Sequence, residues 1–216
     1  STHSVEWQIQ QYSTLTDAVA YTYQQDGHAF YVLNFPTANT TWVFDVATGL
    51  WHERAGFVNG SFTRQRANCQ CNFKGTIIVG DYQDGSIYAL DLTNYADDDR
   101  PQKWLRSWRA LAPGTNNLKR TAQHSLQLNL ETGVGLNSGQ GSDPQVMLRW
   151  SDDGGHTWSR EHWTTVGKIG EYGKRAIWRR LGMTQKLRDR VYEISGTDPV
   201  KISIMGAELL LDGTNA

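Results

Sequence analysis

The chain has 216 residues, of which 38% are hydrophobic and 20% are charged, and its formal net charge is −1. A chain of this length and composition can bury a core without disulfide or metal support, and it does not have the composition of a disordered protein. No apolar run is long enough to span a bilayer, and the polar residues 1–17 lack the pattern of a secretory signal peptide. The near-zero net charge argues against free nucleic-acid binding by the whole molecule.

Opposite charges are concentrated in the two halves of the chain. Residues 1–99 carry 4 basic and 11 acidic side chains, whereas residues 100–216 carry 17 basic and 11 acidic ones. Residues 168–190 hold eight basic groups against two acidic ones, and residues 100–120 hold six basic groups and no acid. This pattern fits solvated sheet faces, and it equally fits two ends that meet different partners, one of them anionic.

Nine Trp, nine Tyr and 21 Gly, with few helical patterns, predict an all-β chain with many turns. Four strands are expected one turn apart in the first quarter of the chain: Val19–Tyr23, His28–Phe35, Thr41–Val46 and Leu50–Glu53. Asp26-Gly27 between the first two is a strong hairpin signal, because both turn positions need a positive φ. A second group is expected at Asn68–Cys71, Thr76–Val79 and Ser86–Leu92, with turns at Lys74-Gly75 and Asp84-Gly85.

These two groups of strands repeat at the spacing of a β-propeller blade. Gly75 follows Gly27 by 48 positions, and Leu90-Asp91-Leu92 follows Phe44-Asp45-Val46 by 46. Two blades cannot close a propeller, which needs at least four. The missing blades would come from neighbouring chains or from a longer chain of which this is the C-terminal part. The start of the sequence, without an initiator Met, favours the longer chain.

The pattern changes after residue 120, so we expect propeller blades over residues 1–120 and a C-terminal β-rich layer or arm over residues 121–216. Leu126, Leu128 and Leu130 alternate with polar residues, which is typical of a half-buried strand. A Gly-rich loop follows at residues 133–141. Further strands are expected at Val146–Trp150, Thr157–Trp163, Ala176–Leu181, Arg190–Ile194 and Val200–Met205. A weak helical pattern at Thr184–Asp189 is interpreted as a loop. Cys69 and Cys71 lie two positions apart on one strand, which favours reduced thiols.

One motif in the C-terminal part is specific for local structure. Ser151, Asp153, Gly155, Thr157 and Trp158 fit the pattern Ser-x-Asp-x-Gly-x-Thr-Trp, which resembles the Asp-box of sialidases and related propellers. Asp153 can accept backbone N–H groups across a tight turn, Gly155 can supply a positive φ, and Trp158 can pack under the hairpin. We interpret the motif as turn support, because a single box is present and the Arg-Ile-Pro signature of sialidases is absent.

Searches for catalytic and metal-binding patterns give no site. His156 and His162 lie near Asp152, Asp153 and Glu161, but their spacing matches no ligand pattern. No nucleophile elbow or phosphate-binding loop is present. Asp97–Asp99 lacks the spacing of a calcium loop. We therefore expect no enzymatic activity, no cofactor and no metal. Trp104 and Trp108 lie among arginines, where they could stack on bases or belong to an interface or core.

Longer blocks of the sequence carry a resemblance to a known family. They include Tyr31–Pro36, Trp42–Arg54, Val79–Gly85, Glu131–Gly135, Gly141–Val146, Trp150–Trp158, Ile169–Tyr172, Trp178–Gly182 and Asp198–Lys201. Together they run from about Ser13 to Met205. The chain resembles the packaged-DNA stabilisation proteins of short-tailed bacteriophages, also called tail hub or nozzle proteins. The stretch Met183–Leu187 is longer than in that family, and family members extend further at the N-terminus.

The resemblance implies a structural virion component rather than an enzyme. Such proteins form a ring, expected to be a hexamer, below the portal and its adaptor. They close the channel after packaging, retain the genome, and carry the tail needle, spike or fibres. The protein would be made in the host cytoplasm and reside in the phage tail, with packaged DNA as a further contact.

A ring subunit needs adhesive surfaces, and Trp and Arg are the residue types that contribute most interface energy. The candidate interface is therefore the basic stretch that contains Lys168, Arg175, Trp178, Arg179 and Arg180, facing an acidic neighbour such as residues 81–99 of the next subunit. A DNA-facing role is the alternative for the same residues. Two other classes stay open: a sialidase-like or carbohydrate-binding propeller with a cleft lined by Trp and paired carboxylates, and a cytoplasmic interaction propeller with all its blades in one chain.

Overall fold

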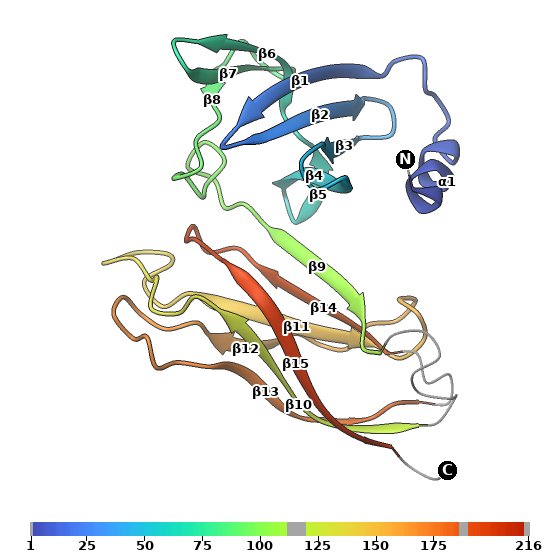
Figure 1. Ribbon diagram of the computed structural model, residues 1–216, viewed down its shortest axis with the longest axis vertical. Coiled ribbons are helices and arrows are strands. Elements are labelled where there is room, and N and C mark those ends of the chain that lie inside the picture. Colours follow the sequence, from blue (N-terminus) through green and yellow to red (C-terminus); the bar gives the residue numbers. More distant parts are fainter. Residues whose placement is uncertain (1, 112–119, 186–189, 214–216) are drawn as a thin grey trace. The chain divides into compact units, whose positions relative to one another are not determined.

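The computed structural model describes residues 2–111, 120–185 and 190–213. The chain divides into two compact units, Ser1–Asn94 and Tyr95–Ala216 (Figure 1). The boundary expected at residue 120 lies inside the second unit. Strand β9 (Trp104–Arg109), which the sequence analysis assigned to the first domain, pairs with β14 (Val191–Gly196) of the second unit.

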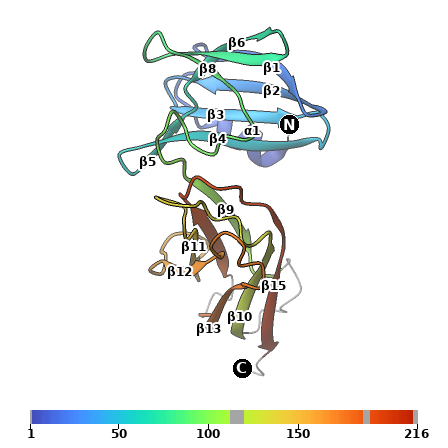
Figure 2. The ribbon, with the colours of Figure 1, turned by 90° about the vertical axis from the view of Figure 1, so that its left-hand side faces the viewer.

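The first unit contains two antiparallel sheets. One has five strands in chain order, β1-β2-β3-β4-β5, and the other has three, β6-β7-β8. Figure 2 shows β1 to β4 side by side in this order. The bounds are α1 His3–Gln10, β1 Val19–Gln25, β2 His28–Phe35, β3 Thr40–Asp45, β4 Leu50–Val58, β5 Ser61–Arg64, β6 Ala67–Phe73, β7 Thr76–Asp81 and β8 Ile87–Ala89. The expected strands of both groups are therefore present, and the first sheet has one strand more than expected.

Two-residue turns set the hairpins of this unit. Asp26 and Gly27 have φ values of 49° and 80°, and Lys74 and Gly75 have 51° and 83°. These left-handed pairs match the twist of the flanking strands, which confirms both predicted turns. Gln25 consequently lies opposite His28, and Phe73 lies opposite Thr76.

The core of the first unit lies between its two sheets. Tyr23, Val32 and Val43 from the five-stranded sheet pack with Ile77 and Val79 from β7. The second group ends sooner than expected, because β8 covers only three residues of the predicted strand Ser86–Leu92. Asp91 accepts hydrogen bonds from the backbone N–H and the hydroxyl of Thr93, which turns the chain.

The helix α1 was not expected from the sequence. Only Val5 of this helix is buried. The segment therefore lacks the apolar periodicity from which a helix could be predicted. The segment after it contacts the five-stranded sheet, where the indole N–H of Trp42 donates to the Tyr12 hydroxyl at 2.9 Å. Within the described residues, no helix has the length and apolarity that a bilayer span requires.

The second unit is a β-sandwich. One sheet has the order β13-β10-β15 and the other β12-β11-β14-β9. Their remaining bounds are β10 Thr121–Leu130, β11 Gln145–Ser151, β12 His162–Thr165, β13 Ala176–Met183 and β15 Ile204–Gly213. The predicted alternation of β10 is confirmed, because Leu126, Leu128 and Leu130 are 1%, 3% and 8% exposed. They pack with residues of the facing sheet, including Leu148 and Ile194.

Two strand predictions in this unit were wrong in position. The strand expected at Thr157–Trp163 begins at His162, because the turn that starts at Ser151 extends to Thr157. The strand expected at Val200–Met205 begins at Ile204 and runs to Gly213. Here Pro199 is the central residue of a tight three-residue turn, in which the Val200 N–H donates to the Asp198 carbonyl. Part of the predicted loop Thr184–Asp189, residues 186–189, lies outside the described residues.

Candidate assembly surfaces of the second unit

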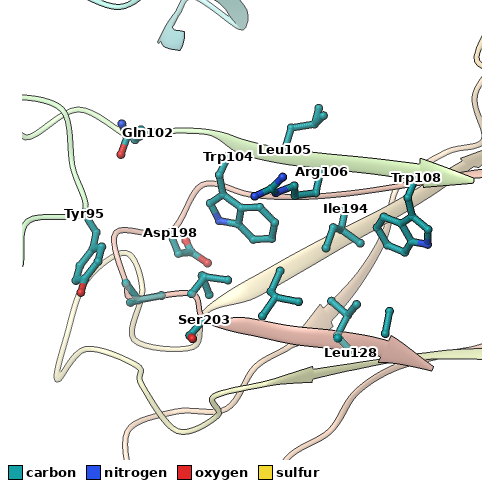
Figure 3. Close-up of a pocket in the computed structure, with 15 residues that line it drawn as sticks. Tyr95, Gln102, Trp104, Leu105, Arg106, Trp108, Leu128, Ile194, Asp198 and Ser203 are labelled. Carbon is teal, nitrogen blue, oxygen red and sulfur yellow. The ribbon is translucent and has the colours of Figure 1, made fainter. Parts of the chain in front are cut away.

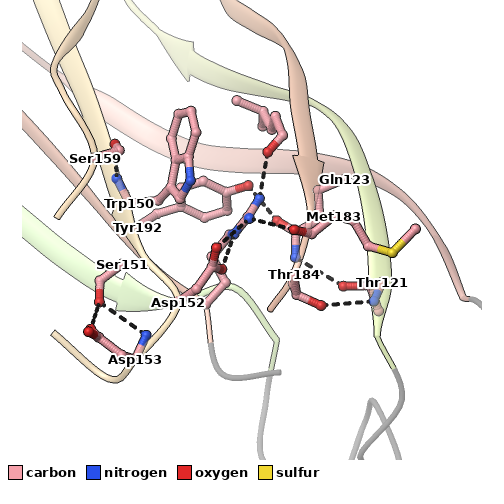
Figure 4. A network of polar contacts seen from close by, with 12 residues as sticks. Thr121, Gln123, Trp150, Ser151, Asp152, Asp153, Ser159, Met183, Thr184 and Tyr192 are labelled. Carbon is pink, nitrogen blue, oxygen red and sulfur yellow. Dashed lines mark hydrogen bonds and ion pairs between the residues drawn. The ribbon is translucent and has the colours of Figure 1, made fainter. Parts of the chain in front are cut away.

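The Asp-box residues hydrogen-bond to one another at the end of β11, and Figure 4 shows the contact between Ser151 and Asp153. The Ser151 hydroxyl donates to Asp153 at 2.6 Å and accepts the Gly155 N–H at 2.8 Å. Asp153 also accepts the backbone N–H of Thr157 at 2.8 Å and its hydroxyl at 2.6 Å. Gly155 has a φ of 104°, a conformation that side chains rarely adopt. Trp158 is half-buried, with the Arg149 guanidinium 4.7 Å from its ring centre.

These contacts make the turn sensitive to acid. Hydrogen bonds from Ser151 and Thr157 hold the pKa of Asp153 well below its ordinary value of 3.8. A depressed pKa means that the ionised carboxylate contributes stability above the unfolded-state pKa, and this contribution is lost as the pH falls below about 3.8.

We therefore expect Asp153→Asn to weaken the acid dependence of stability. Wild-type protein should lose more stability than the variant between about pH 5 and about pH 3. Chemical denaturation at both pH values measures the difference. An equal loss in both proteins would contradict this role of the carboxylate, and Glu161→Gln, a change in an exposed carboxylate nearby, serves as the control.

The buried side chain of Arg190 connects the two sides of the sandwich beside the Asp-box. Figure 4 labels two of its partners, Asp152 and Met183. The side chain of Arg190 is 2% exposed and binds both carboxylate oxygens of Asp152, at 2.6 and 2.8 Å. Its remaining N–H groups donate to the carbonyls of Leu181, at 2.8 Å, and Met183, at 3.2 Å. Asp152 directly follows β11, and the two carbonyls belong to β13 of the facing sheet.

Two further hydrogen bonds cross between the sheets. The Tyr192 hydroxyl on β14 donates to the amide oxygen of Gln123 on β10. The Trp178 indole N–H on β13 donates to the His162 carbonyl on β12 at 2.8 Å. These four side-chain and backbone groups are thus paired inside the sandwich, as burial requires. Sequence reasoning did not identify Arg190, Asp152, Tyr192 or Gln123 as a set, because no local pattern joins them.

The candidate interface residues divide into exposed and buried members. Lys168, Arg175, Arg179 and Arg180 are exposed, whereas Trp178 is 5% exposed and lies in the sandwich core. The placement of Trp178 at the interface is therefore wrong. Its side chain alternates with that of Ile177 and shares the inward face with Ala176.

A β-bulge exposes two consecutive arginines. Gln123 lies opposite Gly182 and Ser125 opposite Arg179, so β13 has two residues where β10 has one. Arg180 has a φ of 61° within this bulge. Among the described residues, the side chains of Arg175, Arg179 and Arg180 have neither a hydrogen bond nor an ion pair. Lys168 lies near Glu171, whose carboxylate accepts the Lys168 N–H and pairs with Lys174 at 3.8 Å.

The residues that imitated a metal site are engaged otherwise. Asp152 binds Arg190, Asp153 binds Ser151 and Thr157, and the His162 ring stacks on Trp150 at 4.8 Å. Burial, with a smaller effect of Arg160, lowers the pKa of His162. No group of three His, Cys, Asp or Glu side chains in the described ranges is arranged to hold a metal ion.

A groove that sequence reasoning missed lies along one open side of the sandwich (Figure 3). It has a volume of about 910 Å³ and runs between the edge strands β9 and β15. Trp104, Arg106 and Trp108 project from β9, and Leu128 and Ile194 lie deeper. The signal in the sequence was the alternation of Trp, Arg and Trp on a strand, which the sequence analysis left as base stacking, interface or core.

Two family models match the chain, and they divide it as the structure does. Residues 1–95 match the model described as bacteriophage P22 Gp10, beta-propeller. Residues 104–211, half of the chain, match the model described as bacteriophage P22 Gp10, beta-sandwich. No curated protein matches the chain. The all-β chain thus combines a propeller-like N-terminal unit with a C-terminal sandwich, and it belongs to the packaged-DNA stabilisation proteins of phage tails, the family of bacteriophage P22 Gp10.

Proposed function

We propose that this virion protein assembles into a ring, expected to be hexameric, that lies below the portal and its adaptor. The ring closes the channel after packaging and carries the tail needle, spike or fibres. The subunits are made in the host cytoplasm and reside in the phage tail. Family membership supports the structural, DNA-stabilising role, and the unpaired arginines of β13 support the ring.

The observation on which the ring rests is a set of three exposed arginines whose side chains pair with no acid among the described residues. Arg175, directly before β13, and Arg179 and Arg180 within it form what we call the β13 basic surface. An anionic partner would neutralise these exposed cations. The bulge in β13 gives Arg179 and Arg180 a fixed backbone position, which lowers the entropy lost on binding.

The first unit supplies a suitable partner surface. Residues 1–94, which make up this unit, have a net charge of −4, from 4 basic and 8 acidic side chains. A contact between the acidic unit of one subunit and the β13 basic surface of the next joins two different surfaces. Such head-to-tail contacts close into a ring when the rotation between subunits divides a full turn.

Reversing the charge of the basic surface tests this contact. The triple variant Arg175→Glu, Arg179→Glu, Arg180→Glu is expected to remain monomeric in about 0.15 M salt, where exposed charges are screened only beyond about 8 Å. Analytical ultracentrifugation measures the assembly, and circular dichroism verifies the fold. Arg160→Glu, at another exposed arginine of the same unit, should assemble like wild type.

The same variant separates the ring from a contact with DNA. A triple variant that forms an unchanged ring would refute the proposed subunit contact. If that variant also bound DNA more weakly, with a reduced dependence on salt, the basic surface would face packaged DNA instead.

A further inference from the structure

The groove between β9 and β15 has the form of a sandwich with one strand missing. β9 and β15 are the terminal strands of their sheets on this side. Core residues Leu128 and Ile194, 3% and 2% exposed, form its floor, and Val200 and Ile202 add aliphatic surface. An apolar cavity of this size beside open strand edges is suited to an extended peptide segment, which supplies both side chains and backbone groups.

Strand β9 presents a free edge along this groove. The Ala110 N–H donates to the Arg190 carbonyl, which fixes the register between β9 and β14. Since bonded and free residues alternate along an edge strand, the backbone groups of Leu105 and Ser107 face away from β14. The side chains of Trp104, Arg106 and Trp108 point toward the groove (Figure 3).

Arg106 is the cation of this groove. Its side chain is exposed, and within the described residues it takes part in no hydrogen bond or ion pair. Asp198, which also lines the groove, is already engaged, because it accepts the Gln145 N–H at 2.7 Å. An occupant that carries a carboxylate among apolar side chains therefore complements the lining.

The first unit contains a segment with these properties. Strand β8 is the terminal strand of its sheet, and the Leu90 N–H donates to the Ile77 carbonyl of β7. The backbone groups of Ile87 and Ala89 consequently face away from β7. The Ile87 side chain is 72% exposed, and Ile87, Ala89 and Asp91 share the exposed side of the segment.

The charges around the two strands are opposite in sign. Residues 81–94, the part of the first unit that contains β8, hold three acidic groups and no basic one, whereas residues 100–111, around β9, hold four basic groups and no acidic one. Both hydrogen bonds that Asp91 accepts from Thr93 end on Oδ1. The Oδ2 atom of Asp91 accepts no hydrogen bond from the described residues and is available to a cation.

We propose that the groove binds β8 of a second copy of this chain, which pairs in parallel with β9, inserts Ile87 between the β9 and β15 walls, and places Asp91 at Arg106. This inference deepens the proposed ring and rests on it for its setting. Each subunit then contributes an edge strand to its neighbour and receives one, which is a head-to-tail contact. The pairing also covers an apolar strand edge that would otherwise promote aggregation.

A peptide that copies residues 83–93 tests the groove without a ring. The receptor is the full chain with Ile87→Asp, so that its own β8 does not compete for the groove. Fluorescence anisotropy of the labelled peptide should show saturable binding. Arg106→Glu in the receptor should weaken binding by about tenfold, which corresponds to the loss of one ion pair in a partly dry site. Arg160→Glu, outside the groove, should have no effect.

Filling the groove gives a second test that spares the core. Ala207 is an exposed residue of β15 that lines the groove, and Met205 on the same strand is exposed outside it. Ala207→Trp should reduce peptide affinity at least about tenfold, as expected for occlusion of an interface centre. Met205→Trp should leave the affinity unchanged. Equal effects of the two substitutions, or no saturable binding, would overturn the proposal.

Three comparisons separate this inference from other outcomes. If ultracentrifugation shows a ring but the peptide does not bind and Ala207→Trp assembles normally, the groove proposal fails while the ring stands. If the peptide binds but ultracentrifugation shows no ring, the ring proposal fails while the groove proposal stands. The third comparison is calorimetry, which measures the binding of maltohexaose and of a sialylated oligosaccharide. Saturable sugar binding that Ala207→Trp abolishes, in the absence of peptide binding, would assign the groove to saccharides.

Discussion

Replacement of Arg190 by Ala is expected to lower the free energy of unfolding of the second unit by about 3–5 kcal/mol. The change leaves the Asp152 carboxylate, whose side chain is 11% exposed, without its cation. It also removes the donors to the Leu181 and Met183 carbonyls at the same place. A buried group that loses its partner costs the full penalty of its lost hydration, so the truncation is more harmful than the net value of the ion pair.

Guanidinium denaturation followed by Trp fluorescence measures this effect. Six of the nine Trp residues, at positions 104, 108, 150, 158, 163 and 178, belong to the second unit and report on its unfolding. Arg179→Ala is the matched control, because Arg179 is exposed and such substitutions usually change stability by less than about 0.5 kcal/mol.

A double-mutant cycle with Asp152→Ala isolates the pair. The two single changes remove the same contact, so the double variant should be more stable than the sum of the single losses predicts. Additive losses, or a loss for Arg190→Ala no larger than for Arg179→Ala, would show that Arg190 does not fasten the sheets.

Local signals predicted the hairpins well, because each depends on two or three neighbouring residues. Asp26-Gly27 and Lys74-Gly75 adopt the positive φ values that the turn requires, whatever surrounds them. The alternation from Leu126 to Leu130 likewise has a local cause, since side chains of a strand point to opposite faces in turn. The Asp-box belongs to the same class, because its hydrogen bonds join residues no more than four positions apart.

Contacts between distant segments could not be predicted in this way. Asp152 and Arg190 are 38 positions apart in the sequence. The walls of the groove come from β9 and β15, which are the first and last strands of the second unit in chain order. Only the packing of two sheets brings them together. The boundary expected at residue 120 failed to separate the units for the same reason: the change in pattern was visible there, but the pairing of β9 with β14 was not.

The bulge in β13 explains why composition alone placed Trp178 at the interface together with its two arginine neighbours. Arg179 and Arg180 beside Trp178 were interpreted as one adhesive surface, because both residue types are enriched at interfaces. The period of a strand puts Trp178 on the face of Ala176, and the bulge then lets both arginines remain outside. Composition identified the exposed arginines. The buried Trp is identified only by the alternation of side chains between the two faces of the strand.

Trp178→Ala is therefore expected to damage the fold rather than an interface. Trp178 is 5% exposed and packs in the sandwich core, and its indole N–H satisfies the His162 carbonyl. Truncation of a buried Trp leaves a large cavity, and the expected loss in the free energy of unfolding is about 3–5 kcal/mol. Trp163→Ala is the matched control, because Trp163 is 59% exposed and should cost less than about 1 kcal/mol.

Stability and assembly must be measured on the same Trp178 variants to separate the two roles. Trp178→Phe keeps most of the buried volume and loses the hydrogen bond, so its stability should lie between those of wild type and Trp178→Ala. Chemical denaturation gives the stability, and ultracentrifugation of the folded Trp178→Phe protein gives the assembly. Normal assembly with reduced stability is expected, because the ring contact depends on the arginines outside the sheet. A Trp178→Phe protein with wild-type stability and lost assembly would return Trp178 to the interface.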